Sequence, residues 1–110
     1  MQLPNAEHAI VAVEKLRDYC LNLEHPRGRH KARVFIASTG LTADHLDNLR
    51  NILLRMAREG DCVPTYCDEF GQRYALDFML RGPTGQARVR STWIIRTNED
   101  FPRLTSCYML

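Results

Sequence analysis

The chain has 110 residues, which predicts one domain over 1–110. Hydrophobic residues at 45% and charged residues at 25% are ordinary globular values, and the net charge of +2 permits an anionic partner without requiring one. No apolar run approaches the roughly 20 residues that cross a bilayer. The N-terminal residues predict no signal peptide, so we expect a cytoplasmic protein with no membrane partner.

Helical patterns dominate the chain before Gly60. The apolar run Ala9–Val13 fits either a strand or a buried helix, whereas the apolar spacing from Glu14 onward is helical. A short helix is predicted over His30–Ala37. The clearest helix has Thr42 as its N-cap and Gly60 as its stop, because leucines recur at helical spacing between them.

Beyond Gly60 the apolar period changes from helical to two. This predicts strands over Tyr74–Leu80, Ala87–Arg96 and Arg103–Tyr108, with an added edge strand over Cys62–Tyr66. Gly82–Gly85 is a strong turn, and connections this short join antiparallel neighbours. The predicted fold class is therefore α+β, with N-terminal helices packed on a C-terminal antiparallel β-meander of about four strands.

Most enzyme classes lack a signature in this chain. Cys62 and Cys67 have no second close pair beside them, so the spacing predicts no zinc site. No glycine-rich phosphate loop, serine nucleophile elbow or His-Glu-x-x-His motif is present. We therefore expect neither a metal nor a cofactor.

Two groups of cations are the candidate functional residues. The first lies at one loop and the predicted start of the His30–Ala37 helix, and consists of His25, Arg27, Arg29, His30, Lys31 and Arg33. In the second, Arg88, Arg90 and Arg96 share a side of one predicted strand with Thr92, and Val89, Ser91 and Trp93 take the other. Arg103 and Thr105 fall on one side of the last strand and Tyr108 on the other.

Guanidinium and hydroxyl groups together suit phosphate binding. The alternative is a solvated sheet face, since an antiparallel sheet often leaves one face in water. By the same alternation Trp93 is predicted to lie in the core, and Tyr108 to be partly buried.

The chain also resembles, nearly end to end, an uncharacterised bacterial domain family. The resemblance rests on an ordered series of stretches, which are Leu3–Ala6, Glu14–Tyr19, Glu24–Phe35, Gly40–Leu41, Gly71–Tyr74, Gly82–Gly85, Arg90–Ile94 and Pro102–Tyr108. That family occurs alone and at the C-termini of polymorphic toxins and phage head-associated proteins. Its layout is similar to the barnase, EndoU, colicin and RelE group of RNase toxins, a likeness of fold alone. The chain departs from the usual family ending at Thr105 and Cys107, where Val and Ala are commoner.

The resemblance implies a metal-independent ribonuclease controlled by a cognate antitoxin protein. A base would take the ribose 2′-OH proton and a cation would stabilise the charged phosphate intermediate. His30 has the pKa that suits a base best, whereas the resemblance favours Lys31, as a charge or as a base. Arg90 and Arg103 would clamp the phosphate, and Tyr108 would donate a proton or stack a base. The residues predicted to bind the RNA substrate are Lys15, Arg33, Arg88, Thr92 and Thr105.

Two other functions fit the same residues. The domain could be a non-catalytic module that binds RNA or a protein through the basic sheet face. It could instead be the antitoxin or immunity partner, although an acidic surface would suit that role better. The ribonuclease hypothesis makes one geometric demand, that the His30 and Lys31 group and the Arg90 and Arg103 group face one cleft.

Overall fold

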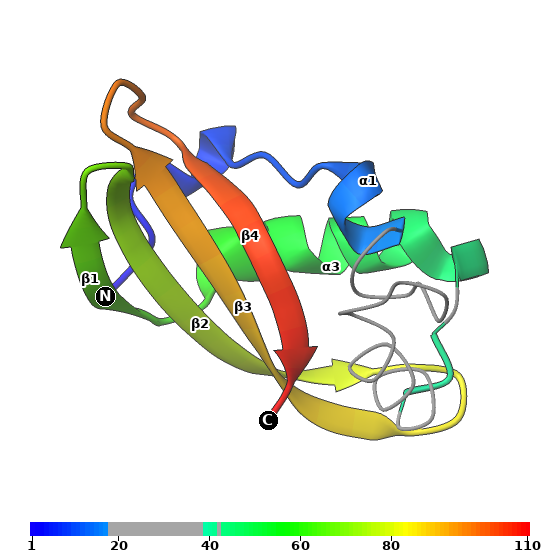
Figure 1. The fold of residues 1–110 in the computed structure, drawn as a ribbon. Helices are drawn as coiled ribbons and strands as arrows, with labels where there is room; N and C mark the ends of the chain where they lie inside the picture. The colour runs from blue at the N-terminus through cyan, green and yellow to red at the C-terminus, as the bar shows by residue number, and fades with distance from the viewer. Residues whose placement is uncertain (18–38, 42) are drawn as a thin grey trace.

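The computed structural model describes residues 1–17, 39–41 and 43–110, and in these it has the predicted α+β architecture (Figure 1). Helix α3 crosses behind a four-stranded sheet. The elements before the sheet are the 3₁₀ helix η1 (Ala6–His8), α1 (Val13–Lys15), the 3₁₀ helix η3 (Ala43–His45) and α3 (Leu46–Glu59). The predicted helix over His30–Ala37 and the predicted N-cap Thr42 lie outside the described residues.

The sheet is an antiparallel meander in which each strand pairs with the next along the chain. Its order is β1 (Cys62–Asp68), β2 (Gly71–Arg81), β3 (Gln86–Arg96) and β4 (Pro102–Met109). The predicted turn joins β2 to β3, where the Gly82 N–H donates to the Gly85 carbonyl oxygen over 2.8 Å. The predicted edge strand is β1, so the strand predictions are confirmed.

The core lies between α3 and one face of the sheet. Leu49, Leu53 and Ala57, one helical turn apart, are fully buried on α3. Trp93 of β3 is also fully buried, as predicted, and its indole N–H donates to Ser91 Oγ over 2.9 Å. The Ser91 hydroxyl in turn donates to the Leu76 carbonyl oxygen, so the buried polar groups of Trp93 and Ser91 are both paired.

The N-terminal segment extends the sheet beyond β4. Ile10 forms a parallel bridge with Arg103, with the Ile10 N–H donating to Pro102 and the Leu104 N–H donating to Ile10. The ambiguous apolar run is therefore extended at Ile10, and α1 begins at Val13. Among the described residues, no helix is both long and apolar enough to cross a membrane.

Candidate functional site

The candidate site lies on the distal face, defined here as the face of the sheet turned away from α3. On β3 the side chains of Val89, Ser91 and Trp93 are buried, so Arg88, Arg90 and Thr92 project from the other side. Arg88 is exposed, whereas Arg90 and Thr92 are half-buried. The period-two alternation of the sequence thus predicted the face of this strand correctly.

A row of three polar side chains crosses the distal face at Arg90. The register pairs Asp77 of β2 with Arg90 of β3, and Arg90 with Tyr108 of β4. Arg90 Nε and Nη2 donate to the two Asp77 carboxylate oxygens over 2.8 and 2.9 Å, a bidentate pair. We call Asp77, Arg90 and Tyr108 the central row.

The charges of the central row stabilise one another. The hydrogen bond from Arg90 holds the pKa of the Asp77 carboxyl below its ordinary value, against the opposing effect of burial. The pKa of the Arg90 guanidinium is raised, mainly by its hydrogen bond to Asp77 and further by Tyr108. Both groups are therefore charged at neutral pH, and the phenol oxygen of Tyr108 lies within their field.

The position of Tyr108 corrects a prediction. Strict alternation predicts that Tyr108 and Arg103 project from opposite sides of the last strand. In the structure Thr92 pairs with Ser106 while Trp93 pairs with Leu104, so Thr105 is an extra residue in β4. This β-bulge reverses the alternation beyond it and brings Tyr108 into register with Arg90 on the distal face.

The bulge also gathers three hydroxyl groups. Thr92 Oγ1 lies 2.6 Å from Thr105 Oγ1 and 3.1 Å from Ser106 Oγ. Thr92 and Thr105 were both predicted to bind substrate, and the structure places them in contact. Ser106 was not predicted, because its side is set by the bulge.

Arg103 is the second predicted phosphate clamp, and it also holds a carboxylate. Its Nε and Nη2 donate to the two Glu99 oxygens over 2.9 and 2.8 Å. Its guanidinium carbon lies 5.0 Å from the centre of the Phe101 ring, and Arg96 lies 3.9 Å from the same Glu99. The hydrogen bond from Arg103 lowers the pKa of Glu99 and raises that of Arg103.

A small cavity of about 170 Å³ adjoins Arg103 at the edge of the sheet. Three predicted site residues line it, namely Lys15 of α1 with Arg103 and Thr105 of β4, and Arg96 lines it as well. The extended segment at Ile10 positions α1 beside β4 and so brings Lys15 to this place. Arg88 and Arg90 lie elsewhere on the distal face and do not line this cavity.

The remaining predicted site residues, His30, Lys31 and Arg33, lie outside the described residues. The shared cleft of His30 and Lys31 with Arg90 and Arg103 therefore remains a prediction. Among the described residues no three His, Cys, Asp or Glu side chains gather to hold a metal ion.

Sequence reasoning missed the carboxylates that hold the two arginines. Asp77 lies in the polar phase of its strand, so its face could have been found from alternation. Its pairing with Arg90 depends on the register that the 82–85 turn sets. Glu99 precedes Arg103 by four residues across a loop, a spacing with no general meaning outside a helix.

The fold and the distal face thus define a small α+β domain with paired arginines and carboxylates across an antiparallel sheet. Residues 2–110 match the family described as Domain of unknown function (DUF6883), and the chain belongs to that family. A search of the curated proteins found no match to the chain.

Proposed function

We propose that the domain is an endoribonuclease of the toxin kind, which binds RNA across the distal face and cleaves it by metal-independent transesterification. The observation that carries the proposal is the central row, where a guanidinium fixed by a carboxylate lies beside a phenol. A fixed guanidinium is a strong stabiliser of a pentavalent phosphate, because it needs no reorganisation during the reaction.

The proposed reaction is balanced without a co-reactant. A base takes the proton of the ribose 2′-OH, the 2′ oxygen bonds to phosphorus, and the bond from phosphorus to the 5′ oxygen breaks. The leaving 5′ oxygen receives a proton, and the proposed donor is Tyr108, which is in register with Arg90. The products are a 2′,3′-cyclic phosphate and a 5′-hydroxyl end.

Asp77 is assigned a positioning role in this scheme. Its lowered pKa makes it a weak base at neutral pH, whereas its two hydrogen bonds fix the plane of the Arg90 guanidinium. The base role stays with His30 or Lys31, as the sequence predicts. The antitoxin likewise remains part of the proposal, and it rests on the family resemblance.

The first prediction concerns cleavage. Purified wild-type protein should cut total RNA and leave 2′,3′-cyclic phosphate ends, and EDTA should not stop it. Arg90→Ala, Arg103→Ala and Lys31→Ala should each slow cleavage about a hundredfold or more, because each removes a cation from the charged intermediate.

Expression of the wild type alone should inhibit growth, and a small adjacent reading frame should rescue it if it encodes the antitoxin.

The matched control is Arg58→Ala, an exposed arginine on the helix side of the molecule, which should cleave as wild type does. Circular dichroism would establish that every variant is folded. Loss of cleavage on chelation, restored by a divalent ion, would defeat the mechanism.

A non-catalytic binding module is the second candidate. The observation that favours it is that Arg90 and Arg103 already bind carboxylates through two nitrogens each. Wild-type protein that binds RNA without cutting it would establish this function. If the protein neither binds nor cleaves RNA, the distal face is only a solvated sheet face and the site assignment is wrong.

A further inference from the structure

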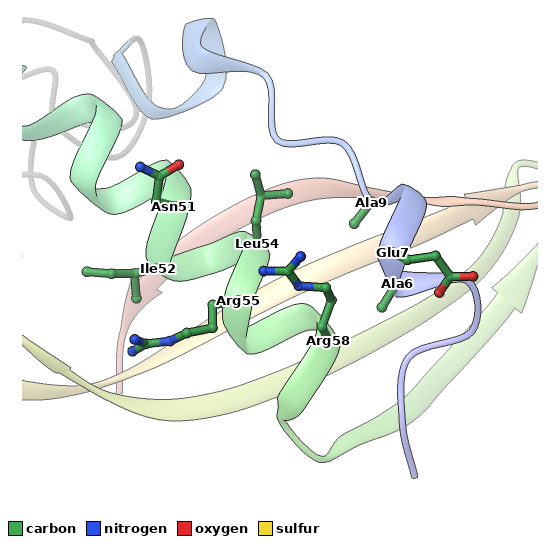
Figure 2. Close-up of a pocket in the computed structure, with 8 residues that line it drawn as sticks. All are labelled: Ala6, Glu7, Ala9, Asn51, Ile52, Leu54, Arg55 and Arg58. Atoms are coloured by element: carbon green, nitrogen blue, oxygen red, sulfur yellow. The ribbon is translucent and has the colours of Figure 1, made fainter.

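The side of the molecule opposite the distal face carries a groove along α3. One hollow of about 430 Å³ lies over the outer surface of the helix and against η1 (Figure 2). Its lining residues are Ala6, Glu7, Ala9, Asn51, Ile52, Leu54, Arg55 and Arg58. A second hollow of about 350 Å³ shares Asn51 and Ile52 with the first and continues toward His45 and Arg81. We call the two together the α3 groove.

The groove follows from the pattern of α3. Leu49, Leu53 and Ala57 face the core, so the helical period of 3.6 residues places Asn51, Arg55 and Arg58 on the opposite side. Those three residues are exposed. The helix has 14 residues and is therefore about 21 Å long, enough to lie beside a partner segment of several turns or to hold an extended one.

Charge in the α3 groove is predominantly positive. Three arginines line it, Arg55, Arg58 and Arg81, against the single carboxylate of Glu7. Figure 2 shows that carboxylate pointing away from α3. Arg58 has no hydrogen-bond or ion-pair partner among the described residues, and Arg55 has only a 4.0 Å contact with Glu59, one turn along the exposed helix. Neither cation is strongly compensated within the described part of the chain.

The other half of the residues that line the first hollow are apolar. Ala6 and Ala9 line one part, and the half-buried Ile52 and Leu54 flank the row of arginines on α3. An RNA backbone needs cations and hydrogen-bond donors but gains little from alanine and leucine side chains. A segment that carries both carboxylates and apolar side chains would fit the arginines and the apolar residues of this surface. An amphipathic helix or strand docked in a groove usually has that composition.

We propose that the α3 groove binds an acidic, amphipathic segment of a partner protein. Carboxylates of the segment pair with Arg55 and Arg58, and its apolar side chains pack on Ile52, Leu54 and the alanines of the N-terminal segment. The surface is separate from the distal face, so this inference stands whether or not the domain cleaves RNA.

The experiment uses designed peptides as probes against the full chain. The acidic peptide is amphipathic and alternates leucines with glutamates. Its neutral twin is a peptide with glutamine in place of each glutamate, and its basic twin is a peptide with lysine in place of each glutamate. Fluorescence anisotropy should show that the acidic peptide binds at least about tenfold more tightly than the neutral one. The double variant Arg55→Glu/Arg58→Glu should lose the acidic peptide and gain the basic twin, because the charge pairs are reversed rather than removed.

The control variant Thr65→Glu/Gln86→Glu adds negative charge at two exposed sheet positions and should bind the acidic peptide as wild type does. It lowers the net charge by two, as does Arg55→Gln/Arg58→Gln, which should weaken the acidic peptide. Equal loss in these two variants would show only a net-charge effect and would overturn the proposal. So would failure of the acidic peptide to bind. Displacement of the acidic peptide from the wild type by a single-stranded RNA, together with loss of direct RNA binding in Arg55→Glu/Arg58→Glu, would assign the groove to nucleic acid instead.

Discussion

Arg90 and Arg103, the two arginines predicted to clamp a phosphate, are each bound to a carboxylate. Arg90 and Arg103 use Nε and Nη2 for those bonds, and a guanidinium carries five N–H donors in all. A bound phosphate must therefore use the donors that remain or displace the carboxylate. The first case keeps each arginine rigid, and the second requires Asp77 or Glu99 to move.

The Asp77–Arg90 pair makes stability depend on pH in one direction. The folded-state pKa of Asp77 lies below its unfolded value of about 3.9, so the pair contributes stability at neutral pH. That contribution is lost as the pH falls below about 4 and through the folded pKa. Asp77→Asn should therefore unfold at lower urea concentration than wild type at pH 7, with the difference shrinking toward acid.

Asp100→Asn is the matched control, since Asp100 is exposed, lies outside the helices and has no ion-pair partner among the described residues. It should follow wild type at every pH. A difference between Asp77→Asn and wild type that stays constant from pH 7 into acid would contradict a role for the charge of Asp77.

The limits of the sequence at this scale are visible in the same residues. The face of Arg88, Arg90 and Thr92 could be predicted, because alternation along β3 is unbroken from Ala87 to Trp93. The side of Tyr108 could not be predicted. A one-residue bulge in β4 reverses the alternation, and no pattern in the sequence marks where that bulge lies.

At the scale of elements, the apolar spacing of the sequence predicted the helix and strands whose formation depends on residues close together in the chain. Helix α3 and the strands β2 and β3 have strong periodicity and are bounded by turn residues such as Gly60 and Gly82–Gly85. The bridge between Ile10 and Arg103 joins residues far apart in the sequence, so no local pattern predicts it. That bridge decides where α1 lies, and hence that Lys15 reaches the cavity beside Arg103.

The turn between β1 and β2 depends on a glycine. Gly71 has φ +146°, and a Cβ atom there would lie 2.1 Å from the Ile95 carbonyl oxygen of the neighbouring strand. Gly71→Ala should therefore lower the free energy of unfolding by about 1–3 kcal/mol, measured by urea denaturation. Gly85→Ala, in the exposed turn before β3, should change it by less than about 0.5 kcal/mol. Equal effects at both sites would show that the close approach at Gly71 is relieved at little cost.

At the scale of the molecule, the small net charge of +2 conceals two separate basic surfaces. The distal face holds Arg88 with the central row, and the α3 groove holds Arg55 and Arg58 on the other side of the sheet. Any RNA affinity must come from where the cations lie rather than from the overall charge. Removing one arginine from each surface in turn therefore tests which of the two surfaces contacts the RNA.

The salt dependence of RNA binding provides that distinction. Each phosphate contact with single-stranded RNA adds about 0.7 to the slope of log K against log salt, because it releases counterions. Arg88→Ala should reduce the slope for a single-stranded RNA by about that amount, since Arg88 is exposed on the distal face. Arg58→Ala should leave the slope unchanged while weakening the acidic peptide. If Arg58→Ala instead reduces the RNA slope and Arg88→Ala does not, RNA binds along α3 and the proposed site on the distal face is wrong.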